Sequence, residues 1–535
     1  MTPPVLYFDL GNTLVHGPSD NRVPLPDAVA TIETLWQRGY RIGILSNQPV
    51  GMTQALMIDK LNDYGLDAAK FDAITFSSEF DPPKSKPDPE IFDHALSKVG
   101  YTAGSIRTVF ITETLNHIEA ARNLGWRAIH TPYNATCTTA SGECVEALDD
   151  LLDLFPPLEI DVYMRDNSGD DGDEPSSGSF WNSPDLWIRN QNDGGTAHQN
   201  PEAGTDNWFH TRLHNRGEGI ARLVLVTHAV QEWAGTQFVH PNDFVPHTAM
   251  IGILNLVPDE PQIAVVKWEA DNVPPEGTHA CWLSAAYFTG DAIATGSHVW
   301  DSNNLGQKNL SVVEMAPGET AEMAFVIGNR AVLTSRRVVL ELWQSVKGPM
   351  LSAAIRSQSA PALGRAVRRS GIFARVARSA PPRKNVGLRF LTEARVELTE
   401  LLDASNDTAV FDLAPGSEMT FPPGKTAEKK PRVWPDMQLT ARLRKDAKGN
   451  EEVVFDRAAS SGIALGLREC ELLPATLRLT APKDASEGDR IRVDLVQRDD
   501  DGTVIGGISV SVVIRARKSR KSPAKRRSKT ARKKS

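Results

Sequence analysis

Short apolar segments alternate with longer segments of helical periodicity over the first 130 residues, and this alternation constrains the fold more than any other feature. An apolar run at Val5–Phe8 is followed by a segment with helical spacing at Asp27–Arg38. The same reasoning predicts further strands at Arg41–Leu45, Asp72–Phe76, Thr108–Ile111 and Trp126–Ile129, and further helices at Pro89–Val99 and Asn116–Leu124. Strands alternating with helices predict a parallel sheet that is covered on both faces.

Polar side chains stand at the carboxyl ends of these predicted strands. Asp9 follows the first strand, Ser46 the second and Glu113 the fourth, while Lys86 lies just before a predicted helix. Because functional groups of open α/β sheets gather at the carboxyl ends of the strands, we expect these four side chains to converge. Two carboxylates, a hydroxyl and an ammonium group together suit phosphoryl transfer to an aspartate.

Each of these groups has a role in such a reaction. Asp9 would attack phosphorus, and Lys86 would neutralise the phosphate and hold Asp9 ionised. The hydroxyl of Ser46 and the backbone N–H of Asn47 would donate to phosphate oxygens.

A magnesium ion is the expected cofactor of this chemistry. Asp9, the carbonyl of Gly11 and Glu113 would supply its oxygen ligands, and the ion would screen the charge between the carboxylates and the phosphate.

The order and spacing of these motifs resemble the haloacid dehalogenase-like superfamily over residues 1 to about 135. The resemblance rests on Asp-Leu-Gly-Asn-Thr at Asp9–Thr13, on Ser46, on Lys-Pro-Asp-Pro-Glu-Ile-Phe at Lys86–Phe92 and on Glu113. It implies a Rossmann-like α/β fold and an aspartyl-phosphate mechanism. The residues implied to be catalytic are Asp9, Thr13, Ser46 and Lys86.

Two positions depart from the phosphatase pattern of this family. Family phosphatases usually carry a second Asp, as general acid and base, where this chain has Gly11, which has no proton to give. The fourth motif usually holds Asp with a further acid one turn later, whereas this chain has Glu113 and then His117. Two hypotheses therefore stand: a magnesium-dependent phosphoester hydrolase, or a catalytically degenerate domain in a binding or scaffold protein.

The gaps between the motifs are short. About a dozen residues separate Thr13 from the first predicted helix, and the 40 residues from Ser46 to Lys86 are needed for a helix and a strand. Neither gap holds an inserted lid domain, so the sequence resembles the capless type of the family. We expect an open site whose phosphorylated substrate is macromolecular, or is screened by the downstream domains.

The composition changes after Pro156, where short alternating strands rich in Gly, Asn, Asp and Pro begin. Eight of the eleven tryptophans lie between Trp181 and Trp343. They could line a sugar-binding platform, but in a β-rich domain we expect them to be core residues. This part loosely resembles Ig-like modules of multidomain bacterial proteins. The predicted domains are a haloacid dehalogenase-like domain at 1–155, a β-sandwich at 159–350, a basic linker at 351–384, a second β-sandwich at 385–514 and a disordered basic tail at 515–535.

The charge of the chain is unevenly distributed. Residues 515–535 hold 12 of the 59 basic residues and no acid, so the remainder carries 47 basic and 67 acidic residues. Such a tail would attract polyanions, including nucleic acids, by releasing counterions. Folding back onto the acidic body, or an aid to solubility, would explain it equally well.

No apolar run is long enough to span a membrane, and the N-terminus lacks the features of a signal peptide. The four cysteines form no metal motif, and although Cys137 and Cys144 are close enough in sequence to pair, free thiols are the favoured prediction. The expectation is a cytoplasmic protein.

Two further features have a functional and a structural interpretation. The acidic loop Asp166–Glu174 offers oxygen ligands for calcium, although a solvated turn is favoured. Histidines 198, 210 and 214 lie near one another, but their spacing is not that of a metal site and a structural role is favoured.

Overall fold

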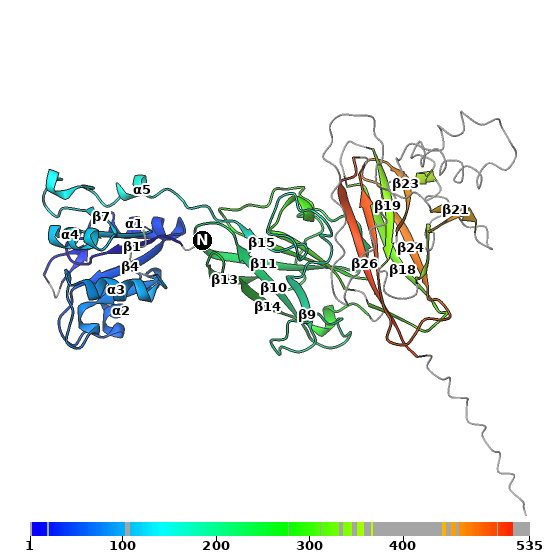
Figure 1. Cartoon of the computed structure of the whole chain (residues 1–535), viewed down its shortest axis with the longest axis horizontal. Coiled ribbons are helices and arrows are strands. Elements are labelled where there is room, and N and C mark those ends of the chain that lie inside the picture. Colours follow the sequence, from blue (N-terminus) through cyan, green and yellow to red (C-terminus); the bar gives the residue numbers. More distant parts are fainter. Residues whose placement is uncertain are drawn as a thin grey trace, which may run out of the picture.

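The chain forms three lobes in a row (Figure 1). The lobes follow one another in sequence, except that one short strand, Ala234–Gly235, pairs within the third lobe. The computed structural model describes residues 3–18, 21–101, 107–275, 278–310, 312–330, 335–344, 350–357, 365–367, 441–445, 451–455, 460–499 and 501–516.

The first lobe is a five-stranded parallel sheet in the order β5-β4-β1-β6-β7, as the alternating pattern predicts. Its strands are β1 (Val5–Phe8), β4 (Arg41–Ser46), β5 (Ala73–Phe76), β6 (Thr108–Thr112) and β7 (Arg127–His130). Its helices are α1 (Ala28–Gln37), α2 (Gln54–Asp63), α3 (Pro89–Lys98), α4 (Leu115–Asn123) and α5 (Leu151–Leu154), with 3-10 turns η1 (Ala68–Lys70), η2 (Ser77–Glu79) and η3 (Thr139–Ser141).

Local sequence signals account for the helix boundaries of this lobe. Helix α3 begins at Pro89, whose missing N–H is not needed in a first turn, and the side chain of Asp88 accepts a hydrogen bond from the N–H of Glu90. After α1, Gly39 adopts a φ of 89°, which an L side chain rarely tolerates, and the chain turns into β4. Two separate apolar clusters cover the two faces of the sheet.

A short hairpin projects between β1 and α1. It consists of β2 (Val15–His16) and β3 (Val23–Pro24), which pair antiparallel. The segment from Ser46 to Lys86 contains α2, η1, β5 and η2 and no inserted domain.

The second lobe consists of two packed sheets, with the orders β14-β10-β8 (and β9 beside β10) and β13-β11-β15-β16. Fully buried aromatic rings, among them those of Phe209, Trp268 and Trp282, fill the space between the sheets, as expected for core tryptophans. The elements are β8 (Val162–Tyr163), β9 (Leu186–Arg189), β10 (Asn207–Asn215), β11 (Ala221–Gln231), β13 (Ile251–Leu256), β14 (Gln262–Trp268), η4 (Ala270–Asn272), β15 (Cys281–Tyr287), η5 (Val299–Asp301) and β16 (Leu305–Asn309).

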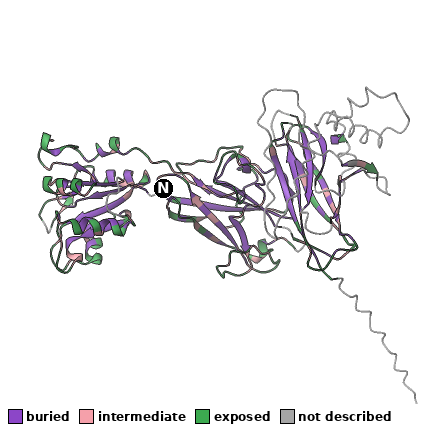
Figure 2. Ribbon diagram, in the orientation of Figure 1, coloured by how far each residue is buried: buried purple, intermediate pink, exposed green. Residues whose placement is uncertain are grey.

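The third lobe is also a two-sheet structure, with the orders β12-β18-β24-β20-β22-β21 and β17-β26-β25-β19-β23. A large apolar cluster lies between these sheets and extends into the second lobe. The strands of the third lobe are largely buried (Figure 2). The strands are β12 (Ala234–Gly235), β17 (Val312–Met315), β18 (Thr320–Gly328), β19 (Arg336–Gln344), β20 (Ser352–Ser357), β21 (Arg442–Lys445), β22 (Glu451–Val454), β23 (Ser460–Leu467), β24 (Leu472–Thr480), β25 (Arg490–Arg498) and β26 (Val504–Ile514).

The sheets divide the chain differently from the predicted boundaries at 350 and 385. Strands β17 to β20, which the sequence pattern assigns to the first sandwich or to the linker, pair with strands of the region after residue 441. In particular, β18 pairs with β24 over nine residues. The prediction differs because alternation identifies a strand but not a partner that lies far away in sequence.

Parts of several predictions lie outside the described residues. Within the predicted linker, Ser352–Ser357 is a strand, whereas 358–364 and 368–384 are not described. Of the predicted tail, only residues 515 and 516 are described. The Pro-Gly turn at Ala316–Glu319 has Gly318 at a φ of 76°, as a type II turn requires, but the similar segment at 414–417 is not described.

The first and second lobes are joined by a buried arginine. Arg222 on β11 donates to both carboxylate oxygens of Asp72 at 3.0 and 3.1 Å, to the carbonyl of Trp36 at 3.1 Å and to the carbonyl of Tyr40. Its guanidinium also lies over the ring of Trp36. These contacts fix how the β-rich lobe sits against the α/β lobe.

The second and third lobes share strands and a buried ring. β12 pairs with β18 although it directly follows β11 of the second lobe. The indole N–H of Trp181 donates to the hydroxyl of Ser509 at 2.9 Å, and a Cβ at Gly507 would lie 2.6 Å from this ring. A glycine is therefore needed at this contact.

Cys137 and Cys144 form a disulfide, so the prediction of free thiols is wrong for this pair. The carbonyl of His130 accepts from the N–H of Val145, which brings the segment after β7 back beside that strand and places the two cysteines 5.9 Å apart at Cα. Disulfides are typical of oxidising compartments, so the cysteines no longer support a cytoplasmic location. Of the other two cysteines, Cys281 is buried and Cys470 exposed.

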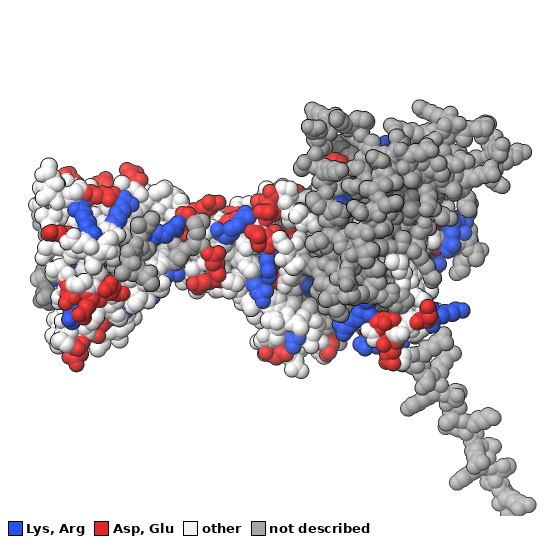
Figure 3. Space-filling model, viewed as in Figure 1, with Lys and Arg blue, Asp and Glu red and all other residues white. Residues whose placement is uncertain are grey.

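Within the described residues, none of the helices combines the length and the apolar character needed to cross a bilayer. Basic and acidic side chains are interspersed over the visible face of the first two lobes (Figure 3).

Candidate active site

Asp9 lies directly after β1, the central strand of the parallel sheet, and is buried. Its Oδ2 lies 2.5 Å from Nζ of Lys86 and accepts a hydrogen bond from the hydroxyl of Thr112 at 3.1 Å. Its Oδ1 accepts from the backbone N–H of Leu10 at 2.8 Å. One carboxylate is thus held in a single orientation by three donors.

Thr13 and Glu113 meet beside this carboxylate. The hydroxyl of Thr13 donates to Oε2 of Glu113 at 2.7 Å and accepts from the N–H of Glu113 at 3.2 Å. Further hydroxyl donors to the Glu113 carboxylate are those of Thr112 and Thr114. The end of β6 is therefore tied to the loop after β1.

The predicted phosphate-binding residues also lie together. Asn47 accepts from the backbone N–H of Lys86 at 2.8 Å and donates to its carbonyl at 3.1 Å, which fixes the loop that carries Lys86. The Lys86 ammonium also donates to the carbonyl of Leu45 at 2.7 Å. Ser46 is buried at the end of β4, and its hydroxyl accepts from the side chain of Gln48.

The electrostatics of the pair favour an ionised aspartate. Burial alone would raise the pKa of Asp9, but the charge of Lys86, the proximity of His117 and the N–H of Leu10 outweigh it and lower the pKa to about 2. Burial lowers the pKa of Lys86, and Asp9 opposes this shift. Asp9 is therefore a carboxylate at neutral pH.

Three contributors to the site were not among the predicted residues. The hydroxyl of Thr112 hydrogen-bonds to the carboxylates of Asp9 and Glu113. Its position at the end of a predicted strand could have identified it as a site residue. His117, on the first turns of α4, lies with Nδ1 3.6 Å from Oδ2 of Asp9, longer than a hydrogen bond. Arg22, from the β2–β3 hairpin, places its guanidinium over Gly11, and no periodicity indicates this position.

The oxygen donors suit a magnesium ion in their chemistry. Asp9, Glu113 and the carbonyl of Gly11 are all hard oxygen ligands, and magnesium is commonly bound by one or two carboxylates together with substrate phosphate and water. Within the described residues, no group of three or more acidic, histidine or cysteine side chains is assembled. The carboxylate ligands available to a metal ion at this site are therefore those of Asp9 and Glu113.

A family model for haloacid dehalogenase-like hydrolases matches residues 6–125. This match covers the parallel sheet from β1 to α4 and each of the residues described above. Residues 6–125 are a haloacid dehalogenase-like hydrolase domain. The predicted α/β fold of this part is confirmed, while the Ig-like resemblance of the following part remains a loose one.

Solved structures similar to the haloacid dehalogenase-like domain come from several bacteria. An uncharacterized protein from Listeria monocytogenes serotype 4b is 23% identical, with 28% of this chain and 96% of that chain covered and a TM-score of 0.25. A hydrolase of the same superfamily from Ehrlichia chaffeensis is 16% identical, with coverages of 29% and 97% and a TM-score of 0.24. A predicted phosphoglycolate phosphatase from Haemophilus somnus 129pt is 16% identical, with coverages of 29% and 99% and a TM-score of 0.25. No curated protein matches the sequence.

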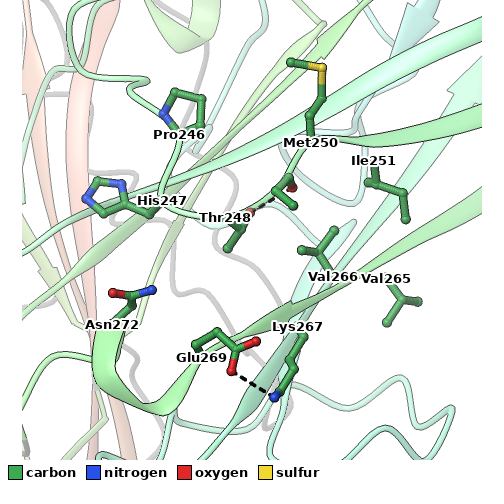
Figure 4. A pocket seen from close by; sticks show the side chains of 11 residues that line it. Pro246, His247, Thr248, Met250, Ile251, Val265, Val266, Lys267, Glu269 and Asn272 are labelled. Atoms are coloured by element: carbon green, nitrogen blue, oxygen red, sulfur yellow. Dashed lines mark hydrogen bonds and ion pairs between the residues drawn. The ribbon is translucent and has the colours of Figure 1, made fainter.

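A separate pocket of about 660 Å³ opens on the second lobe (Figure 4). Apolar side chains such as Met250 and Val266 line it together with Lys267 and Glu269. Lys267 pairs with Glu269 at 2.8 Å and with Asp206 at 2.7 Å, so its charge is already balanced.

The acidic loop and the histidines are used within the fold. Asp170 accepts hydrogen bonds from the backbone N–H groups of Asp166, Gly172 and Asp173, as in a structured turn. His214 bonds to the buried Asp185. His198 accepts from the N–H of Ile188, and His210 stacks on Trp187.

Proposed function

We propose that the haloacid dehalogenase-like domain hydrolyses phosphoesters through an aspartyl-phosphate on Asp9, with magnesium as cofactor. The observation that carries the proposal is the buried pair of Asp9 and Lys86, 2.5 Å apart at the carboxyl edge of the parallel sheet. An ionised, oriented and partly desolvated carboxylate is a competent nucleophile, and the ammonium beside it favours binding of an anionic substrate.

The reaction has two steps. The carboxylate of Asp9 attacks phosphorus, a bond forms between its oxygen and phosphorus, and the bond from phosphorus to the leaving oxygen breaks. Water then attacks phosphorus, inorganic phosphate leaves, and Asp9 is restored. Lys86 neutralises charge on the phosphoryl oxygens, while the hydroxyl of Ser46 and the N–H of Asn47 would donate further hydrogen bonds to them.

The remaining groups hold this arrangement. Asp9, the Gly11 carbonyl and Glu113 would hold the magnesium ion, which when bound supplies positive charge between the carboxylates and the phosphate. Thr13 orients Glu113 through two hydrogen bonds. The absence of an inserted domain between Ser46 and Lys86 supports a capless site, open to a macromolecular substrate or one screened by the other lobes.

The test is phosphate release from p-nitrophenyl phosphate and from a panel of phosphopeptides, with magnesium and with a chelator. Wild type should turn over in a magnesium-dependent way. Asp9→Asn, which keeps the shape but not the nucleophile, should lose at least about 1000-fold in kcat, corresponding to about 4 kcal/mol of barrier.

A matched control is Asp59→Asn, an exposed acid on α2, which should keep wild-type rates. Equal inertness of wild type and Asp9→Asn, with no magnesium binding by calorimetry, would contradict the proposal. The competing role, a degenerate domain in a binding or scaffold protein, would then stand.

A further inference from the structure

The hairpin β2–β3 carries an arginine into the space in front of Gly11. A Cβ at Gly11 would lie 2.9 Å from Nη1 of Arg22 and 3.5 Å from its Cζ and Nη2. A side chain at position 11 would therefore point at this guanidinium. The acid and base usual at this position in family phosphatases is replaced here by a glycine, and a cation occupies the space beside it.

The guanidinium of Arg22 makes no hydrogen bond or ion pair with another described side chain. Its Nε is buried and has no hydrogen-bond partner, and none of the described acids forms an ion pair with it. A buried donor that is left unsatisfied costs free energy, so an anionic ligand that accepts from Arg22 would be stabilised.

A second cation lies close to Arg22. Burial lowers the pKa of Lys60 on α2, and the nearby positive charge of Arg22 lowers it further. Nζ of Lys60 donates to the side chain of Gln48 at 3.2 Å, and Gln48 in turn donates to Ser46 at 2.9 Å. This chain of contacts links the two cations to the end of β4, next to Asp9.

A guanidinium and an acid at this position have opposite consequences for the leaving group. An acid gives a proton to the departing oxygen, whereas an arginine stays protonated and can only donate hydrogen bonds to it. Without a proton donor at position 11, the leaving oxygen departs with the bonding electron pair as an anion. Such a site suits leaving groups that are stable as anions.

We propose that Arg22 binds the departing oxygen directly and that the site is selective for activated phosphoryl donors, namely aryl or acyl phosphates, over alkyl phosphates. The phosphoryl group passes to Asp9 while the leaving phenolate or carboxylate is received by Arg22, with Lys60 adding to the positive potential. This inference rests on the proposed function, since it assigns the substrate class of the same site.

The first experiment compares kcat/KM for p-nitrophenyl phosphate, phenyl phosphate, acetyl phosphate and glycerol 3-phosphate in the full chain with magnesium. Wild type should favour the nitrophenyl and acetyl esters over glycerol 3-phosphate by on the order of 100-fold, the size of the missing acid catalysis. Arg22→Ala should lose at least about tenfold on every ester and most on those with basic leaving groups, because one charge-assisted hydrogen bond is removed.

Three further variants sharpen the comparison. Arg22→Lys keeps the positive charge but loses the planar pair of guanidinium donors. Its kcat/KM should fall between those of wild type and Arg22→Ala. Gly11→Asp places a carboxyl group at position 11, where the atoms it would meet belong to the flexible side chain of Arg22. This variant should raise the turnover of glycerol 3-phosphate relative to that of p-nitrophenyl phosphate. The matched control is Arg127→Ala, at the first residue of β7, which should have the kcat/KM values of wild type.

A second readout does not depend on turnover. Calorimetric titration of p-nitrophenolate, with inorganic phosphate present, should show binding that weakens at least about tenfold in Arg22→Ala, again one charge-assisted hydrogen bond. The inference would be overturned if kcat/KM of the wild type were the same for all leaving groups. It would also be overturned if Arg22→Ala bound p-nitrophenolate as tightly as wild type. If no ester is turned over but nitrophenolate binding depends on Arg22, the anion subsite stands and the proposed hydrolysis fails.

Discussion

The carboxylates of Asp9 and Asp185 are both buried, and yet both keep a lowered pKa. Burial raises the pKa of Asp185, but the hydrogen bonds from His214 and Arg165 outweigh it and lower the pKa to about 2. Arg212 donates to the same carboxylate. In each of the first two lobes, a buried acid is ionised because its charged donors are fixed around it.

Asp185 gives a prediction about acid stability. A lowered carboxyl pKa contributes stability that is fully present above the unfolded pKa of about 4 and is lost as the pH falls through about 2. Asp185→Asn should therefore lose about 2–3 kcal/mol at pH 7 and show a flatter decline below pH 4. Urea unfolding measured from neutral to acid pH checks this, and parallel curves for the two proteins would contradict it.

Site residues at strand ends could be predicted from the sequence, whereas those on loops could not. Asp9, Ser46 and Glu113 follow from the strand pattern, because parallel strands bring their carboxyl ends to one edge. Arg22 and Lys60 reach the site from the β2–β3 hairpin and from the last turn of α2. No periodicity encodes such a path, so only the structure places these cations.

At the scale of elements, the parallel sheet was predictable because each unit is local. The helices and strands of the first lobe begin and end within a few residues of the expected positions. In the third lobe the sequence indicated β structure but not which strands pair, since β18 pairs with β24 and β19 with β25 across more than a hundred residues. Strand β20 fell within the predicted linker. The predicted boundary at 350 therefore falls between two strands of one lobe, β19 and β20.

Close packing within the parallel sheet gives a prediction for β4. A Cβ at Gly43 would lie 2.4 Å from Cε1 of Tyr7 on the neighbouring strand, and Tyr7 is held by a hydrogen bond to Ala95 on α3. Gly43→Ala should destabilise the fold by about 1–3 kcal/mol, because the ring must move in a packed core.

Thermal unfolding by circular dichroism measures this effect. Gly169→Ala is the matched control, since Gly169 is exposed and its nearest contact would be an ordinary 3.5 Å. Equal melting temperatures for the two variants would show that the ring has room to shift.

At the scale of the whole molecule, the three lobes are joined by buried polar contacts rather than by linkers alone. Arg222 couples the α/β lobe to the second lobe, and Trp181 and the pairing of β12 with β18 couple the second to the third. The haloacid dehalogenase-like lobe is therefore fixed to a β-rich body.

Arg222→Ala should weaken the first of these contacts. It removes a buried guanidinium and leaves the carboxylate of Asp72 and two carbonyl groups without their donor, at a cost of about 2–5 kcal/mol. Differential scanning calorimetry should then show the α/β lobe unfolding separately and earlier than the β-rich body. Arg216→Ala, a more exposed ion pair in the second lobe, should change stability by only about 0–1 kcal/mol. A single unshifted transition in Arg222→Ala would contradict this coupling.

The central claim is that Asp9 carries the phosphoryl group, and trapping that group tests it most directly. The full chain would be mixed with p-nitrophenyl phosphate and magnesium, quenched in acid during turnover, and digested for mass spectrometry. We predict one added phosphoryl group on the peptide that contains Asp9, and none in Asp9→Asn. Turnover without any phosphoryl group on that peptide, or turnover that persists in Asp9→Asn, would contradict the mechanism.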